Sequence, residues 1–235
     1  MKWAAAIVIM ETIYNTYSKF QYKQFPLLGM MIHTKNTIKL KEKHYIIDDS
    51  LPATFLHYLD YAAKVLPRVA DLTAFPGEKI FFKLTPVQKK QILKHMVSID
   101  PEFKKYTTHK TTITAWLGIV KRSTVVSKLI SPNAHTDQDD EGVGILTYLN
   151  AVGGGTAMFK RKRTGNCLFN HPFSFEVKDI PTNPYWEMVE RFDNKANRTI
   201  LFPVNELHTA FYDLTAWPEN VAERLTLNIV VRIGS

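Results

Sequence analysis

The sequence contains one cysteine, Cys167, and this scarcity limits the chemistry that the chain can carry. A single cysteine forms no intrachain disulfide and is too little for a cysteine-based zinc site, which fits a reducing, intracellular setting. The sequence also lacks an apolar run as long as a transmembrane helix needs. The apolar run from Trp3 to Met10 ends at Glu11 without a small-residue cleavage pattern, so we expect no secretion signal. These absences predict a soluble, cytoplasmic protein.

The composition is that of a folded domain rather than of a disordered chain. Hydrophobic residues make up 45% and charged residues 22% of the 235 residues, which is enough apolar material for a packed core. Internal repeats and low-complexity linkers are absent, so we expect one main domain over residues 34–235, preceded by a helical extension over residues 1–33. The net charge of +8 is compatible with binding of nucleic acid, with binding of an acidic metabolite, or with a merely soluble basic surface.

The first part of the main domain carries mostly helical patterning. A strand-like segment over residues 37–47 is followed by Ser50, a candidate helix cap, and by Pro52 in the first turn of an amphipathic helix. A second helix is expected over residues 86–98, with its lysines facing solvent.

From residue 111 onward the pattern changes to short strands. We expect strands over residues 111–120, 123–130, 143–150, 156–162, 198–204, 208–212 and 224–232, and a short helix over residues 184–192. Such a succession is typical of a barrel or a sandwich. The predicted fold class is therefore mainly β with flanking helices (α+β), with a barrel over about residues 111–232.

Three residues of metal-ligand type stand out in this β region. His135 and Asp137 are two residues apart, so on an extended backbone both side chains point to the same face. His208, at the start of a later strand, is the natural third ligand, and two histidines with one carboxylate form the facial triad of non-haem iron(II) oxygenases. Taken singly, His-x-Asp also arises by chance in turns, and a lone histidine is often a hydrogen-bonded core residue.

The last predicted strand carries a polar row that includes an arginine. Side-chain alternation puts Arg224, Thr226 and Asn228 on one face and the intervening aliphatic residues on the other. A buried arginine inside a barrel is costly without an anionic partner, and its planar guanidinium can form two parallel hydrogen bonds with a carboxylate. The alternative is a surface arginine on an edge strand.

The order of these segments resembles the prolyl-hydroxylase-like branch of the iron(II)/2-oxoglutarate-dependent dioxygenases, over about residues 132–231. Within that branch, the chain looks most like bacterial members whose substrates are not known. The resemblance rests on His135-x-Asp137, Gly144-Ile-Leu-Thr-Tyr-Leu-Asn150, Gly153-Gly-Gly-Thr156, Arg198-Thr-Ile-Leu-Phe-Pro203, His208 and Arg224-x-Thr226.

The resemblance implies a double-stranded β-helix of the jelly-roll or cupin type that binds Fe(II) through the three candidate ligands. It also implies that 2-oxoglutarate chelates the metal and that its distal carboxylate pairs with Arg224. Tyr148 and Thr226 would add hydroxyl groups there, although a strand tyrosine is more commonly a core residue. The implied reaction uses O2 and releases succinate and CO2, and a role for ascorbate is left open.

The substrate is not identified by the sequence, and neither is the oligomeric state. An amino acid, a peptide or another small molecule is the favoured target. A nucleic-acid demethylase of the same superfamily is an alternative, but such enzymes place a second arginine six residues after the first, whereas Arg232 follows Arg224 by eight. A non-catalytic binding barrel is the other alternative. Halogenation is disfavoured because Asp137 occupies the position that a halide would need.

Two further runs have simpler interpretations. The glycines at 153–155 fit a tight turn better than a phosphate cradle, because no helix follows them. The basic run at 160–163 is either a solvated hairpin or part of a substrate entrance.

Overall fold

The structure is a computed structural model that describes residues 37–40, 43–70, 77–128, 135–137, 141–161 and 186–234. The predicted helical extension over residues 1–33 lies outside these residues, and the domain boundary at residue 34 stays a prediction. Among the described residues, no helix combines the length and the apolar character that crossing a membrane requires.

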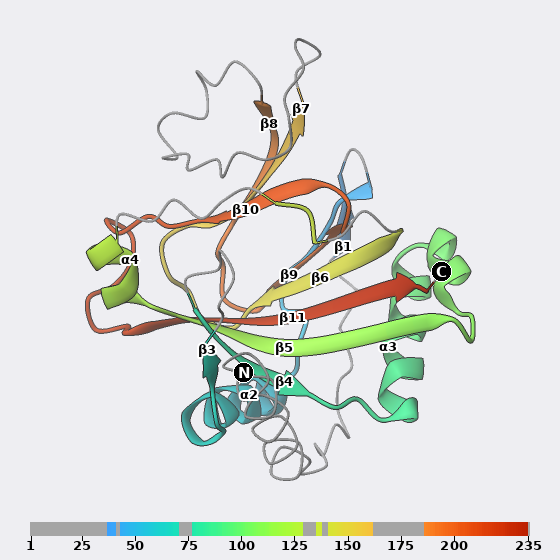
Figure 1. The fold of residues 1–235 in the computed structure, drawn as a ribbon, viewed down its shortest axis with the longest axis horizontal. Helices are drawn as coiled ribbons and strands as arrows, with labels where there is room; N and C mark the ends of the chain where they lie inside the picture. The colour runs from blue at the N-terminus through green and yellow to red at the C-terminus, as the bar shows by residue number, and fades with distance from the viewer. Residues whose placement is uncertain are drawn as a thin grey trace, which may run out of the picture.

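Two antiparallel sheets form the centre of the molecule (Figure 1). The larger sheet has the strand order β1-β2-β9-β6-β11-β5-β4-β3, and the smaller has the order β10-β7-β8. The strands of the larger sheet are β1 (Thr37–Lys39), β2 (Tyr45–Ile47), β3 (Val69–Ala70), β4 (Glu78–Phe82), β5 (Thr111–Lys121), β6 (Gly142–Tyr148), β9 (Arg198–Pro203) and β11 (Glu223–Ile233). Those of the smaller sheet are β7 (Gly155–Arg161), β8 (Trp186–Asp193) and β10 (Leu207–Phe211).

One face of the larger sheet is covered by helices. Helix α2 (Ala53–Val65), helix α3 (Pro86–Ile99) and the 3-10 helix η2 (Pro101–Tyr106) bury Leu59, Ile92 and Phe103 in one hydrophobic cluster. The aliphatic residues of β11 join the same cluster, from Leu225 to Val231 at every second position. Alternation therefore turns Arg224 and the other polar residues of this strand to the opposite face.

The smaller sheet packs on that opposite face, which we call the inner face. Tyr148 and Ile200 of the larger sheet form a buried cluster with Met158 and Phe192 of the smaller one. In Figure 1, β7, β8 and β10 lie above β9 and β6, whereas β5 and β4 lie at the lower edge of the larger sheet. Two facing antiparallel sheets with flanking helices confirm the predicted mainly β, jelly-roll class.

Two of the predicted elements are wrong because tertiary pairing outweighs local pattern. Residues 123–130 were expected as a strand, but helix α4 (Arg122–Lys128) starts there. Strand β5 pairs with β11 only as far as Lys121, opposite Glu223, so the next residues have no strand to pair with. Residues 184–192 were expected as a helix, yet β8 pairs with β7 from Trp186 to Asp193, with one register shift between Met158 and Phe159, and buries Phe192.

Two details of the N-terminal part also differ from expectation. The single strand expected over residues 37–47 is a hairpin of β1 and β2, with Lys43 at a positive φ of 65° between them. Ser50 does not cap α2, whose N-cap is Pro52 without a side-chain hydrogen bond. The Ser50 hydroxyl lies 2.6 Å from the hydroxyl of Thr199 instead, so it ties this segment to β9. The helix expected over residues 86–98 is observed as α3, with a capping box that starts at Thr85.

Candidate metal centre

Backbone pairing brings the three candidate ligands together. His135 forms an isolated antiparallel bridge with His208, in which the amide of each donates to the carbonyl of the other at 2.8 Å. The amide of Asp137 donates to the carbonyl of Val204 at 3.0 Å, in the turn between β9 and β10. The candidate ligand atoms of His135, Asp137 and His208 all lie within 4.8 Å of one another.

The geometry of this cluster leaves one side open. Asp137 Oδ1 lies 3.6 Å from His135 Nε2 and 3.7 Å from His208 Nε2. The His135 side chain is 51% exposed, whereas that of His208 is 8% exposed. A metal ion at this position would therefore be anchored on the buried side by His208 and would remain accessible from the side of His135.

Two neighbours hold the ring of His208 in a metal-binding orientation. His208 Nδ1 lies 2.9 Å from the carbonyl oxygen of Glu206, which can only accept a hydrogen bond. Nδ1 therefore carries the proton, and the lone pair of Nε2 faces Asp137. The ring of Phe202 packs against the imidazole, with centroids 4.8 Å apart. Burial lowers the pKa of His208, which favours the neutral form that binds metal ions.

The carboxylate of Asp137 stays ionised in the cluster. Burial alone would raise its pKa, but the hydrogen bond from His135 and nearby positive charge, that of Arg232 included, outweigh this effect and hold the pKa below its usual range. The donor set is thus two imidazole nitrogens and one anionic oxygen. This set suits a divalent transition metal with open coordination positions, non-haem iron(II) in particular.

Arg224 is a buried cation in the same interior. Its side chain is 3% exposed, and its Nη2 donates to the Gly155 carbonyl at 3.1 Å. The guanidinium carbon lies 5.4 Å from the centroid of the Tyr148 ring and 5.3 Å from that of Tyr212. Within the described part of the chain, its Nε has no hydrogen-bond partner and no carboxylate pairs with it. A buried, uncompensated guanidinium is costly, so this position is suited to an anionic ligand.

The anion position and the metal position lie along one strand of the smaller sheet. Gly155, which accepts the hydrogen bond from Arg224, is opposite Phe211 on β10. Phe211 is three residues beyond His208, a separation of about 10 Å along a strand. Gly155 can lie close to the backbone of Phe192 because it has no side chain. An added Cβ on Gly155 would lie 1.9 Å from the Phe192 carbonyl oxygen.

The other two candidate cosubstrate residues share the face of Arg224. Tyr148 is fully buried, and burial raises its pKa to about 12, so its hydroxyl remains a neutral donor. That hydroxyl donates to Thr156 Oγ1 at 2.8 Å, and it is the ring of Tyr148 that faces Arg224. Thr226 is directly opposite Tyr148, and its hydroxyl accepts from Asn228 Nδ2 at 3.1 Å.

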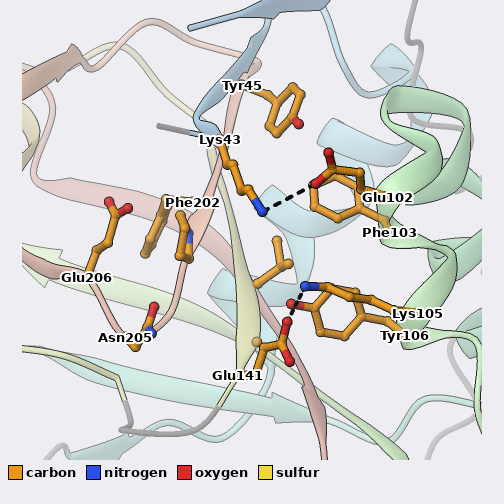
Figure 2. A pocket seen from close by; sticks show the side chains of 13 residues that line it. Lys43, Tyr45, Glu102, Phe103, Lys105, Tyr106, Glu141, Phe202, Asn205 and Glu206 are labelled. Carbon is orange, nitrogen blue, oxygen red and sulfur yellow. Dashed lines mark hydrogen bonds and ion pairs between the residues drawn. The ribbon is translucent and has the colours of Figure 1, made fainter. Parts of the chain in front are cut away.

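A separate cavity of about 340 Å³ is lined by residues of β2, η2, β6 and the turn after β9 (Figure 2). One side of it carries two ion pairs, Lys43 with Glu102 and Lys105 with Glu141. The opposite side is formed by residues that include Phe202 and Glu206, the two neighbours of His208. None of the candidate ligands lines this cavity, so it is distinct from the metal position.

Some contacts at the site escaped the sequence interpretation. Tyr212 follows His208 by four residues, so strand alternation could have placed both on the same face. The carbonyl of Glu206 leaves no sequence signal, because any residue supplies one. In the basic run, Lys160 pairs with Glu187 at 3.5 Å, and residues 162–163 lie outside the described residues.

Comparisons with known proteins identify the fold. No protein-family model matches the chain, and no curated protein matches it. Among solved structures, the non-haem alpha-ketoglutarate-dependent epimerase SnoN from nogalamycin biosynthesis has a TM-score of 0.51 at 11% identity, covering 81% of this chain and 78% of its own. The carbocyclase SnoK from the same biosynthesis has a TM-score of 0.50 at 10% identity, covering 82% and 80%. A prolyl-4-hydroxylase from Pseudomonas putida has a TM-score of 0.48 at 15% identity, covering 83% and 95%. The chain therefore has the fold of SnoN and SnoK, the double-stranded β-helix that the sequence resemblance implies.

Proposed function

We propose that this chain is an iron(II)- and 2-oxoglutarate-dependent dioxygenase that hydroxylates an amino-acid, peptidyl or other small-molecule substrate. One observation carries the proposal: a His-Asp-His cluster and a buried arginine, with no counterion among the residues that the structure describes, occupy the same interior between the two sheets. Neither feature alone requires an oxygenase. Together they match a metal that is chelated by a dicarboxylate whose far end is held by a guanidinium.

The residues divide the task in a way that fits their environments. His135, Asp137 and His208 would hold iron(II), and the hydrogen bond to the Glu206 carbonyl would keep His208 in the binding tautomer. Arg224 would bind the distal carboxylate of 2-oxoglutarate. When bound, the metal and cosubstrate supply O2 activation, and hydroxylation of the substrate is coupled to release of succinate and CO2.

The solved structures of the same fold support this assignment of the cosubstrate. SnoN and SnoK are both described as non-haem and alpha-ketoglutarate-dependent. One is an epimerase and the other a carbocyclase, so the same fold serves more than one oxidative outcome. Hydroxylation is the outcome that we propose for this chain, and the carboxylate of Asp137 disfavours halogenation because it would occupy the position that a halide needs.

A succinate-release screen tests the proposal. The protein is purified without oxygen, loaded with iron(II) and 2-oxoglutarate, and offered amino acids, peptides and methylated oligonucleotides, with Asp137→Ala as the control. We expect iron-dependent succinate formation that a member of the first two groups stimulates and that the variant lacks. Stimulation by methylated oligonucleotides alone would favour the demethylase. Metal binding without any 2-oxoglutarate turnover would instead identify a non-catalytic barrel.

A further inference from the structure

A single row of side chains crosses the inner face of the larger sheet. Strand register places Phe81 of β4 opposite Trp116 of β5, Trp116 opposite Asn228 of β11, and Asn228 opposite Leu146 of β6. Residues directly opposite in antiparallel strands project from the same face. Leu146 belongs to the cluster beneath the smaller sheet, so Phe81 and Trp116 share the face on which the candidate site lies.

The two ends of this row have different environments. Leu146 packs in the core between the sheets, whereas Trp116 is half-buried and Phe81 is 47% exposed. The Phe81 and Trp116 rings have centroids 6.4 Å apart, and Lys79 Nζ lies 5.4 Å from the centroid of the Trp116 ring. We call Lys79, Phe81 and Trp116 the aromatic shelf. It occupies the β4–β5 side of the sheet, away from the strands above which the smaller sheet lies (Figure 1).

Arg232 lies on the same face, at the end of β11 nearest the candidate metal centre. It is opposite Gly142, where an added Cβ would lie 3.3 Å from Arg232 Cγ, so the arginine side chain packs across this glycine. Gly142 also accepts a hydrogen bond from the amide of Val204 at 3.2 Å, and the Val204 carbonyl accepts one from the amide of Asp137 at 3.0 Å, so Arg232 lies at the end of the sheet that carries the triad. Its Nε is buried without a hydrogen-bond partner, and no ion pair of Arg232 occurs among the described residues.

We propose that the aromatic shelf and Arg232 bind the primary substrate, and that this substrate is a small molecule with a flat apolar ring and a carboxylate. The inference rests on the proposed function and names the substrate class for the same site. A flat ring would stack on Phe81 and Trp116, and a carboxylate would meet the guanidinium of Arg232. Four residues of β5, about 14 Å of strand, separate the row of Trp116 from that of Arg232. The ring and the carboxylate therefore belong at opposite ends of the molecule.

The chemistry of this surface favours a small anionic molecule over the other substrates. Arg232, at the end of the proposed site opposite the aromatic shelf, is cationic, and its buried Nε has no hydrogen-bond partner among the described residues, which complements a carboxylate. The aromatic shelf contains only two aromatic rings, those of Phe81 and Trp116, so it accommodates one ring system of a ligand rather than a row of several.

Binding of a matched pair of probes tests the proposal without turnover. 8-Phenyloctanoate and its neutral amide, 8-phenyloctanamide, share a ring and differ in charge, and their chain is long enough to reach from the row of Trp116 towards Arg232. Their affinities for the nickel(II)-loaded and the metal-free full-length chain are measured by saturation-transfer NMR titration. We expect the acid to bind at least fivefold more tightly than the amide. Arg232→Gln should abolish this preference and leave the affinity for the amide unchanged.

Variants of the aromatic shelf complete the test. Trp116→Leu and Phe81→Ser should each weaken both probes at least fivefold, and the exposed position of Phe81 makes its replacement compatible with folding. Lys64→Gln, an exposed position on α2 on the helical side of the sheet, serves as the control and should change neither affinity. Absence of binding to the wild type, equal affinities for acid and amide, or unchanged binding in both shelf variants would overturn the proposal.

Titration of 2-oxoglutarate into the same samples separates the proposed substrate site from the proposed dioxygenase function. If 2-oxoglutarate does not bind but the two probes behave as expected, the dioxygenase is rejected and the aromatic shelf remains a binding site.

Discussion

Replacing Arg224 by methionine removes the guanidinium while it keeps most of the apolar stem in place. In the ligand-free protein, two effects oppose each other. The variant relieves the burial of an unpaired charge, but it also leaves the Gly155 carbonyl without the hydrogen bond from Nη2, which costs about 1 to 3 kcal/mol. We therefore expect the free energy of unfolding without 2-oxoglutarate to change by no more than about 1 kcal/mol.

The effect on 2-oxoglutarate binding should be much larger. Loss of a buried charged partner costs about 2 to 5 kcal/mol in binding, or about 30-fold to several thousandfold in affinity. For the wild type, 2-oxoglutarate at 100 times its dissociation constant adds about 2.7 kcal/mol of stability, which raises the Tm by about 5 to 10 °C for a chain of this size. At the same concentration, Arg224→Met should keep at most about a third of this increase, because a 30-fold weaker affinity leaves about 0.9 kcal/mol of stabilisation.

Thermal unfolding of the nickel(II)-loaded proteins measures both effects in one assay. Arg191→Met is the matched control, because Arg191 is an exposed arginine of β8 that pairs with Asp193. The control should show the full increase in Tm with 2-oxoglutarate. An Arg224→Met protein that is stabilised by 2-oxoglutarate as much as the wild type would remove Arg224 from the cosubstrate site. A variant that is several kcal/mol less stable but keeps that increase would identify Arg224 as a structural residue.

The remaining predictions concern the metal, the tyrosine and acid stability. Alanine at any one of the three candidate metal ligands should abolish iron-dependent turnover while circular dichroism shows an intact fold; these ligands are His135, Asp137 and His208. Tyr148→Phe should weaken 2-oxoglutarate binding less than loss of Arg224 does, because the ring that faces the guanidinium is kept; equal defects in a parallel titration would contradict this. The hydrogen bond from Arg198 lowers the pKa of Asp48 to about 2, so the ion pair stabilises the fold above the ordinary carboxyl pKa and is lost as the pH falls from about 4 towards 2. Urea unfolding of Asp48→Asn should show a flatter pH dependence in this window, with a difference below about 1 kcal/mol at neutral pH because the pair is partly exposed; a slope equal to that of the wild type would contradict it.

The fold class and the candidate site were accessible from sequence because both depend on alternation along single strands. In β11, alternation separates Leu225 and Leu227 from Arg224 and Thr226, and the structure shows the first pair in the helical core and the second on the inner face. The order of the ligand-type residues allowed the resemblance to be stated, and the solved structures confirm the fold that it implies. The roles of the individual site residues stay predictions for the experiments above.

The sequence by itself determined which side chains face the interior and which chemical groups they bring, since period-two patterns are local properties of the chain. Only the tertiary structure decided what those side chains meet. Residues 122–128 form a helix because β11 begins opposite Lys121, about a hundred residues later in the chain, and residues 186–193 form a strand because β7 is available to pair with them. His135 meets His208, and Trp116 shares a face with Asn228, through strand pairings between segments that are distant in sequence. Such pairings depend on the free energy of the whole sheet, and no local pattern of residues encodes them.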